Sequence, residues 1–152
     1  MFKTYEILDI AIQLENNAET LYRSKAREFD RSDLRELMIW MADEEKNHAQ
    51  WFASLKNRVK ISDEEALMRE MSEDLLTDFM GKACFSLDDA VFQEIRTKSE
   101  LVETFIEFEE DTILFYELLQ SFITDDDTAK NLKNIIEEEK KHINTFKQKG
   151  FL

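Results

Sequence analysis

Two parts of the chain repeat one another at an offset of 94 residues. Residues 44–48, Glu-Glu-Lys-Asn-His, align with residues 138–142, Glu-Glu-Lys-Lys-His. The same offset aligns two further pairs of residues: Glu15 with Glu109, and Tyr22 with Tyr116. An internal repeat indicates one supersecondary unit that is used more than once. We therefore expect the chain to fold into two similar units related by a pseudo-twofold axis.

Each unit is predicted to be a pair of helices. Apolar residues such as Ile7, Ala11 and Leu14 recur every three or four positions, the period of a helix with one buried face. The chain has no proline and only two glycines, the residues that the interiors of long helices avoid. Asp33 and Glu36 have the spacing of a capping box and are expected to open the second helix.

The predicted helices form two hairpins joined by a long connection. The hairpins span about residues 3–58 and 98–148, and residues 59–97 form a partly helical crossover. A four-helix bundle with one long crossover is the ferritin-like topology. We therefore expect an all-α, ferritin-like bundle in which residues 1–152 are a single domain, long enough to bury a core.

The chain has two histidines, and each follows a glutamate by three positions: Glu45-x-x-His48 and Glu139-x-x-His142. Three positions on a helix correspond to about 4.5 Å of rise on one face. The two side chains of each pair can therefore approach one cation from the same direction.

Two further glutamates are expected to face these motifs. Glu15 and Glu109 each interrupt an apolar stripe at a position that faces the core. The midpoint of Glu15 and Glu45 is residue 30, in the first turn, and the midpoint of Glu109 and Glu139 is residue 124, in the second. Residues equidistant from the turn of an antiparallel hairpin lie side by side. Each glutamate therefore meets the motif of its own hairpin, and the pseudo-twofold axis brings both sets together.

Four carboxylates and two imidazoles around one point predict a site for two metal ions, with six ligands: Glu15, Glu45, His48, Glu109, Glu139 and His142. Buried carboxylates without partners are strongly destabilising, and two divalent cations would neutralise them. Carboxylate and imidazole ligands suit iron or manganese, and zinc can occupy the same cage. The alternative is a set of surface residues or buried ion pairs, which the shared offset disfavours.

Tyr22 and Tyr116 each lie two turns beyond one of these glutamates. Two interpretations stay open for them. They are either core aromatics or residues whose phenol donates a hydrogen bond to a ligand carboxylate and orients it.

Charge and composition exclude several classes of partner. The formal net charge of −14 argues against binding to nucleic acid or to an anionic membrane surface, both of which need basic patches. No apolar run approaches the roughly 20 residues of a membrane span, and the first residues have no signal-peptide pattern, so we expect a cytoplasmic location. The single cysteine excludes an intrachain disulfide and a four-cysteine metal site.

With these six residues and both hairpins, the chain resembles the rubrerythrins, within the ferritin-like superfamily. The resemblance implies a di-iron site that reduces hydrogen peroxide or, as in several relatives, oxidises ferrous iron. Two features depart from the family pattern. With one cysteine, the chain is expected to lack the rubredoxin-like domain, and Thr112 stands where rubrerythrins carry an extra glutamate one turn beyond the third-helix ligand.

We therefore expect a non-haem di-iron oxidoreductase that reduces hydrogen peroxide or dioxygen. Its catalytic carboxylates would be Glu15, Glu45, Glu109 and Glu139, its electrons would come from an external donor such as a rubredoxin, and its assembly would be a homodimer. Two alternatives stay open: an iron-sequestering protein with ferroxidase-like chemistry, and a helical module that metal ions stabilise.

Overall fold

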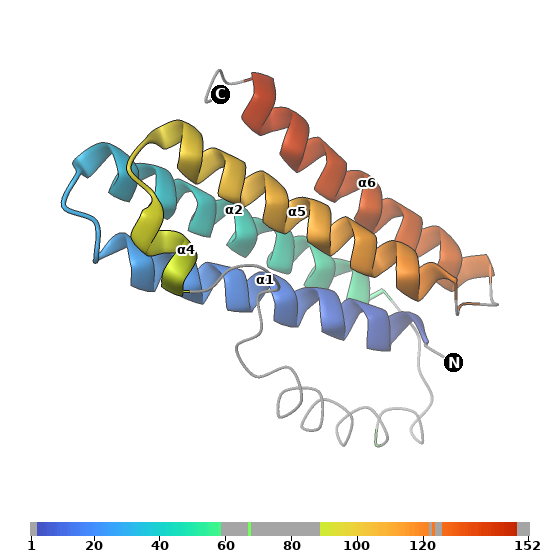
Figure 1. The fold of residues 1–152 in the computed structure, drawn as a ribbon. Helices are drawn as coiled ribbons and strands as arrows, with labels where there is room; N and C mark the ends of the chain where they lie inside the picture. Colours follow the sequence, from blue (N-terminus) through green and yellow to red (C-terminus); the bar gives the residue numbers. More distant parts are fainter. Residues whose placement is uncertain (1–2, 59–66, 68–88, 122, 124–125, 149–152) are drawn as a thin grey trace.

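The computed structural model describes residues 3–58, 67, 89–121, 123 and 126–148. These residues form five α-helices and no strand (Figure 1). The helices are α1 (Thr4–Ala26), α2 (Ser32–Lys56), α4 (Asp89–Glu94), α5 (Lys98–Gln120) and α6 (Asp126–Gln148). No helix within the described ranges is long and apolar enough to cross a membrane. The predicted all-α fold is confirmed.

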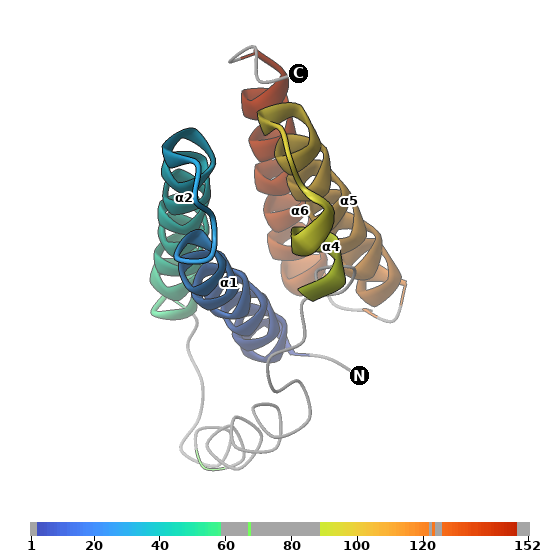
Figure 2. The same cartoon turned by 60° about the vertical axis from the view of Figure 1, so that its left-hand side comes forward.

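The long helices form two hairpins that pack against each other. Figure 2 shows α1 and α2 as one pair and α5 and α6 as the other. Around the bundle, α1 packs beside α2 and α6, while α5 packs beside α6 and α2. The short helix α4 precedes α5 and belongs to the predicted crossover. Residues 59–66 and 68–88 of that crossover lie outside the described residues.

Aromatic side chains join the two hairpins across the core. Tyr22 of α1 meets Phe105 of α5 edge to face, with ring centroids 4.9 Å apart. Trp40 of α2 meets Phe146 of α6 in the same manner at 5.5 Å. Tyr22, Phe105 and Phe146 are fully buried. Such contacts stabilise a packed core beyond the area they bury, and they fix the height of one hairpin against the other.

The start of α2 differs from the prediction. The helix begins at Ser32 with Arg31 at the N-cap, and no side chain caps it. Asp33 lies inside the first turn, where its carboxylate pairs with Arg31 at 2.6 Å and accepts a hydrogen bond from the Leu34 amide. The capping box predicted at Asp33 and Glu36 is therefore wrong. The Asp33 carboxylate still lies at the positive end of the helix, where a negative charge is stabilising.

The cap of α5 gives a testable contribution to stability. Thr97 precedes the helix, and its hydroxyl oxygen accepts a hydrogen bond from the Glu100 amide at 3.1 Å. Thr97→Ala should lower the free energy of unfolding by about 1 kcal/mol, because one amide at the helix start loses its acceptor. Urea unfolding measures this loss, with the exposed neighbour Ser99→Ala as control. Equal midpoints for the two variants would contradict the assignment of the cap.

Candidate metal centre

The four long helices direct polar side chains into the middle of an apolar core. Each of α1 and α5 supplies one glutamate, and each of α2 and α6 supplies one glutamate and one histidine. We call these residues the carboxylate–histidine cluster: Glu15, Glu45, His48, Glu109, Glu139 and His142. The structure brings together all six residues that the repeat predicted as ligands. Five of them are at most 3% exposed, and the side chain of His48 is 14% exposed.

His48 faces two carboxylates from different hairpins. Its Nδ1 atom lies 3.6 Å from Oε1 of Glu15 and 3.6 Å from Oε1 of Glu139. These distances exceed those of a hydrogen bond. They leave room for an ion between the nitrogen and the two oxygens.

His142 occupies the corresponding place in the second half of the repeat. Its Nδ1 atom lies 3.2 Å from Oε1 of Glu109 and 3.8 Å from Oε1 of Glu45. The rings of His142 and His48 are 4.5 Å apart between centroids. Each histidine therefore turns its Nδ1 atom toward one glutamate of its own hairpin and one glutamate of the other hairpin.

The cluster divides into three overlapping sets of possible metal ligands, within each of which the ligand atoms lie within 4.8 Å of one another. One set is Glu15, Glu45 and His48, and a second is Glu45, Glu109 and His142. The third set joins Glu139 to both histidines. Glu45 and Glu139 are therefore the carboxylates that belong to both halves of the cluster, while Glu15 and Glu109 each belong to one.

The buried polar atoms of the cluster lack hydrogen-bond partners within the part of the chain that the structure describes. Both carboxylate oxygens of Glu45, Glu109 and Glu139 are buried without a hydrogen bond among the described residues. The same holds for both ring nitrogens of His142 and for Nδ1 of His48. Buried polar groups are normally satisfied, and a buried group without a partner is destabilising. A pair of divalent cations would satisfy these oxygen and nitrogen donors, so the residues present fit a two-metal centre.

Three of the four cluster carboxyl groups resist ionisation when no cation neutralises them. Burial, followed by the negative charge of a neighbouring glutamate, raises the pKa of three carboxyl groups well above the usual 4.5: Glu15, Glu45 and Glu109. Burial also opposes ionisation of Glu139, but close polar contacts with Glu109 and His48 outweigh it and hold the Glu139 pKa below its usual value. Without metal, the cluster therefore retains protons that bound cations would replace.

The two histidines have opposite protonation preferences. Burial disfavours the charged form of His48, but the contact with Glu139 and the surrounding carboxylates raise its pKa to about 10. Burial, followed by the charge of His48, lowers the pKa of His142 to about 3. The repeat therefore places the two rings alike but gives them different surroundings.

The two tyrosines of the repeat are both fully buried. Tyr22 packs edge to face against Phe92, Phe105 and Phe108. The Tyr116 hydroxyl has no hydrogen-bond partner among the described residues, and burial, followed by the charge of Glu15, raises its pKa. A hydrogen bond from either phenol to a ligand stays a prediction.

Thr112 lies three residues beyond Glu109 on α5 and is buried. Its hydroxyl donates a hydrogen bond to the Phe108 carbonyl at 2.9 Å within the same helix. This position therefore offers the cluster no carboxylate. Sequence reasoning did not single out Glu44, whose Oε2 atom lies 3.9 Å from Nε2 of His142. The sequence feature that could have indicated this residue is that a second glutamate precedes each Glu-x-x-His motif.

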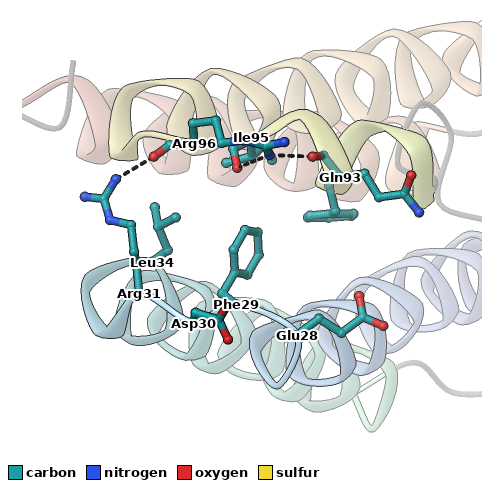
Figure 3. Close-up of a pocket in the computed structure, with 9 residues that line it drawn as sticks. Glu28, Phe29, Asp30, Arg31, Leu34, Gln93, Ile95 and Arg96 are labelled. Atoms are coloured by element: carbon teal, nitrogen blue, oxygen red, sulfur yellow. Dashed lines mark hydrogen bonds between the residues drawn. The ribbon is translucent and has the colours of Figure 1, made fainter.

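A cavity of about 280 Å³ lies away from the cluster, between the α1–α2 turn and the segment around α4 (Figure 3). Phe29 and Leu34 line it from one side, and Phe92 and Ile95 line it from the other. Arg31 reaches across its edge to the Arg96 carbonyl. No residue of the carboxylate–histidine cluster lines this cavity, so it is separate from the candidate metal centre.

The bundle and its cluster define a four-helix protein with a carboxylate-rich site in its core. A crystal structure from Thermotoga maritima, described as that of a ferritin-like diiron-carboxylate protein, has the same fold. The TM-score is 0.54 over 97% of this chain and 93% of that chain, at 22% sequence identity. The predicted ferritin-like fold is therefore confirmed.

The Rubrerythrin family model matches residues 6–149, which include all six cluster residues. The chain belongs to the rubrerythrin family, as the sequence resemblance indicated. No match was found among curated proteins.

Proposed function

We propose that the chain is a di-iron oxidoreductase that reduces hydrogen peroxide or dioxygen with electrons from an external donor. The observation that supports this proposal best is the carboxylate–histidine cluster, whose buried oxygen and nitrogen atoms have no hydrogen-bond partner among the described residues. Family membership and the diiron-carboxylate description of the Thermotoga maritima structure point to iron as the metal.

The ligand sets suggest a role for each carboxylate. Glu15 would hold the ion next to His48, and Glu109 the ion next to His142. Glu45 belongs to two sets and would bridge the ions. Glu139 lies in one set with both histidines and would be shared between the two ions. Each ion would then have one glutamate and one histidine of its own, with two shared carboxylates.

Reduction of hydrogen peroxide to two water molecules consumes two electrons and two protons, and a bound ferrous pair would supply the two electrons.

The protein around the cluster controls access to it. The apolar core excludes bulk water from the carboxylates, which strengthens every electrostatic interaction within the site. His48 is the most exposed member of the cluster, so its side of the site is the expected entry for a small oxidant. Cytoplasmic carriers such as a rubredoxin would supply the electrons.

Anaerobic titration tests the proposal directly. Metal-free protein should bind two ferrous ions per chain, because the three overlapping ligand sets give each histidine one glutamate that the other histidine does not share. One equivalent of hydrogen peroxide should then oxidise both ions in a single turnover, and a reduced rubredoxin should restore the ferrous state. The optical absorbance of the bound iron, which changes with its oxidation state, follows both steps.

A pair of neighbouring variants controls this experiment. Glu109→Ala should abolish oxidation, since it removes a buried ligand, whereas Glu110→Ala should leave it intact, since Glu110 is exposed on the same helix. A wild-type diferrous protein that reacts with neither peroxide nor dioxygen would exclude the oxidoreductase and leave iron storage or a structural role.

A further inference from the structure

The internal repeat is broken at one position beside the ligands. Residues 44–48 and 138–142 agree except at their fourth position, which is Asn47 in the first half and Lys141 in the second. Both positions are exposed. The first motif therefore has a neutral amide on its surface where the second has a cation.

This difference sets the partner of the first glutamate in each motif. In α6, Lys141 binds Glu138 with 3.1 Å between Nζ and Oε1. In α2, Asn47 carries no charge and offers Glu44 no such ion pair. The carboxylate of Glu44 instead faces the other hairpin, with its Oε2 atom 3.9 Å from Nε2 of His142.

His142 needs an acceptor at that nitrogen. Its Nδ1 atom faces Glu109 and Glu45 and is the nitrogen available to a metal ion. A neutral imidazole that binds metal through Nδ1 carries its proton on Nε2. In His142 this Nε2 atom is buried and has no hydrogen bond among the described residues. Glu44 is the carboxylate next to it. Its side chain is 30% exposed and can rotate to shorten the distance.

His48 does not have the same need. Its side chain is 14% exposed, so water can reach the outward edge of the ring. Glu138, the repeat equivalent of Glu44, is engaged by Lys141. The two halves of the cluster therefore differ outside the ligand shell, although their ligands are the same.

We propose that Glu44 is a positioning residue for His142. Its carboxylate accepts a hydrogen bond from the Nε2–H group and fixes the tautomer that presents Nδ1 to one metal ion. The two metal positions are therefore unequal, and the position at His142 holds its ion more tightly. This inference rests on the proposed two-metal site. A carboxylate behind a ligand histidine orients the ring and raises its basicity, and its loss typically weakens metal binding about 10- to 100-fold.

Zinc titration of the full chain tests the inference without depending on redox activity. Wild-type protein should bind two zinc ions. Glu44→Ala should weaken one of the two by about 10- to 100-fold and leave the other unchanged. The zinc affinity of Glu44→Gln at this position should lie between those of the wild type and Glu44→Ala, because the amide oxygen still accepts a hydrogen bond but carries no negative charge. The matched control Glu138→Ala should titrate like the wild type, because Lys141 already occupies Glu138.

Nitrogen-15 NMR of the histidine rings separates positioning from a general loss of structure. The chain has only two histidines, and His48→Ala identifies the signals of His142. In the zinc-loaded wild type, the Nε2–H proton of His142 should be protected from exchange with water. Glu44→Ala should lose this protection while the His48 signals stay in place. The melting curve of metal-free Glu44→Ala, which should match the wild type, checks that the fold is intact.

The outcomes distinguish the inference from the proposed function. If the wild type binds two zinc ions but Glu44→Ala and Glu138→Ala give the same titrations and spectra, Glu44 has no positioning role and the two-metal site stands. If the wild type binds fewer than two ions, the two-metal site fails and the inference fails with it.

Discussion

Loading the metal-free protein with ferrous iron should raise its melting temperature by about 10–20 °C near neutral pH. An ion present at about 100 times its dissociation constant stabilises the fold by about 2.7 kcal/mol, so two such ions contribute about 5 kcal/mol. For a chain of this size, each kcal/mol corresponds to about 2–4 °C. Anaerobic calorimetry measures the shift. Coincident melting curves with and without metal would contradict a metal centre in the core.

The same shift should widen as the pH rises. The three glutamates whose pKa burial raises contribute stability that is fully present below pH 4.5 and is lost at higher pH. His48, with its pKa raised to about 10, acts in the same direction above pH 6.5. Glu139 and His142 have lowered pKa values and act in the opposite direction, but their contribution is complete above pH 6.5.

Between pH 6.5 and about pH 9, the metal-free protein should therefore lose stability as the pH rises. The metal-bound protein should not follow it, because metal ions bind the deprotonated ligands and higher pH favours them. Melting curves of both forms at several pH values test the sign. A metal-free form whose stability does not fall over this range would show that the buried carboxyl groups and His48 retain no protons there.

Replacing Glu45 by leucine should change the two forms in opposite directions. The metal-free protein should gain about 1–3 kcal/mol, because leucine removes a buried carboxyl group that has no hydrogen-bond partner among the described residues. The metal-loaded protein should lose most of its stabilisation, since Glu45 belongs to the ligand sets of both histidines. Oxidation by peroxide should fall to the level of the metal-free protein.

Glu36→Leu is the matched control for this variant, because Glu36 lies on the same helix and is exposed. It should leave both melting temperatures and the metal content nearly unchanged. Equal stability of metal-free wild type and metal-free Glu45→Leu would mean that the Glu45 carboxyl group is not penalised by burial. Metal binding that survives in Glu45→Leu would remove Glu45 from its bridging role.

The convergence of the six cluster residues could be predicted from the sequence because it depends on helix geometry alone. Glu15 and Glu45 are equidistant from one turn, as Glu109 and Glu139 are from the other, so antiparallel pairing brings each pair to one height. The repeat then supplies the relation between hairpins. None of these steps requires knowledge of the side chains that surround the cluster.

Neighbours on other helices could not be predicted in the same way. Tyr22 and Tyr116 are equivalent in the repeat, but Tyr22 packs among phenylalanine rings, while burial, followed by the charge of Glu15, raises the pKa of Tyr116. Equivalent positions share a helix face without sharing the residues opposite. The approach of Glu44 to His142 depends on both hairpins and on one surface substitution, and no periodicity reveals it. The start of α2 depends on a local ion pair at Asp33 that competes with the capping geometry.

Each half of the repeat carries half of the ligands, and each ligand set that holds Glu45 with His142 or Glu139 with His48 draws on both halves. A lone hairpin of this design could build a complete centre only by pairing with an identical copy. Every substitution in such a homodimer would appear twice, and the two ions would stay equivalent by symmetry. Joining two hairpins in one gene product removes that constraint. One half can then acquire a lysine while the other keeps an asparagine, and two chemically distinct ion positions can evolve within an almost symmetric ligand set.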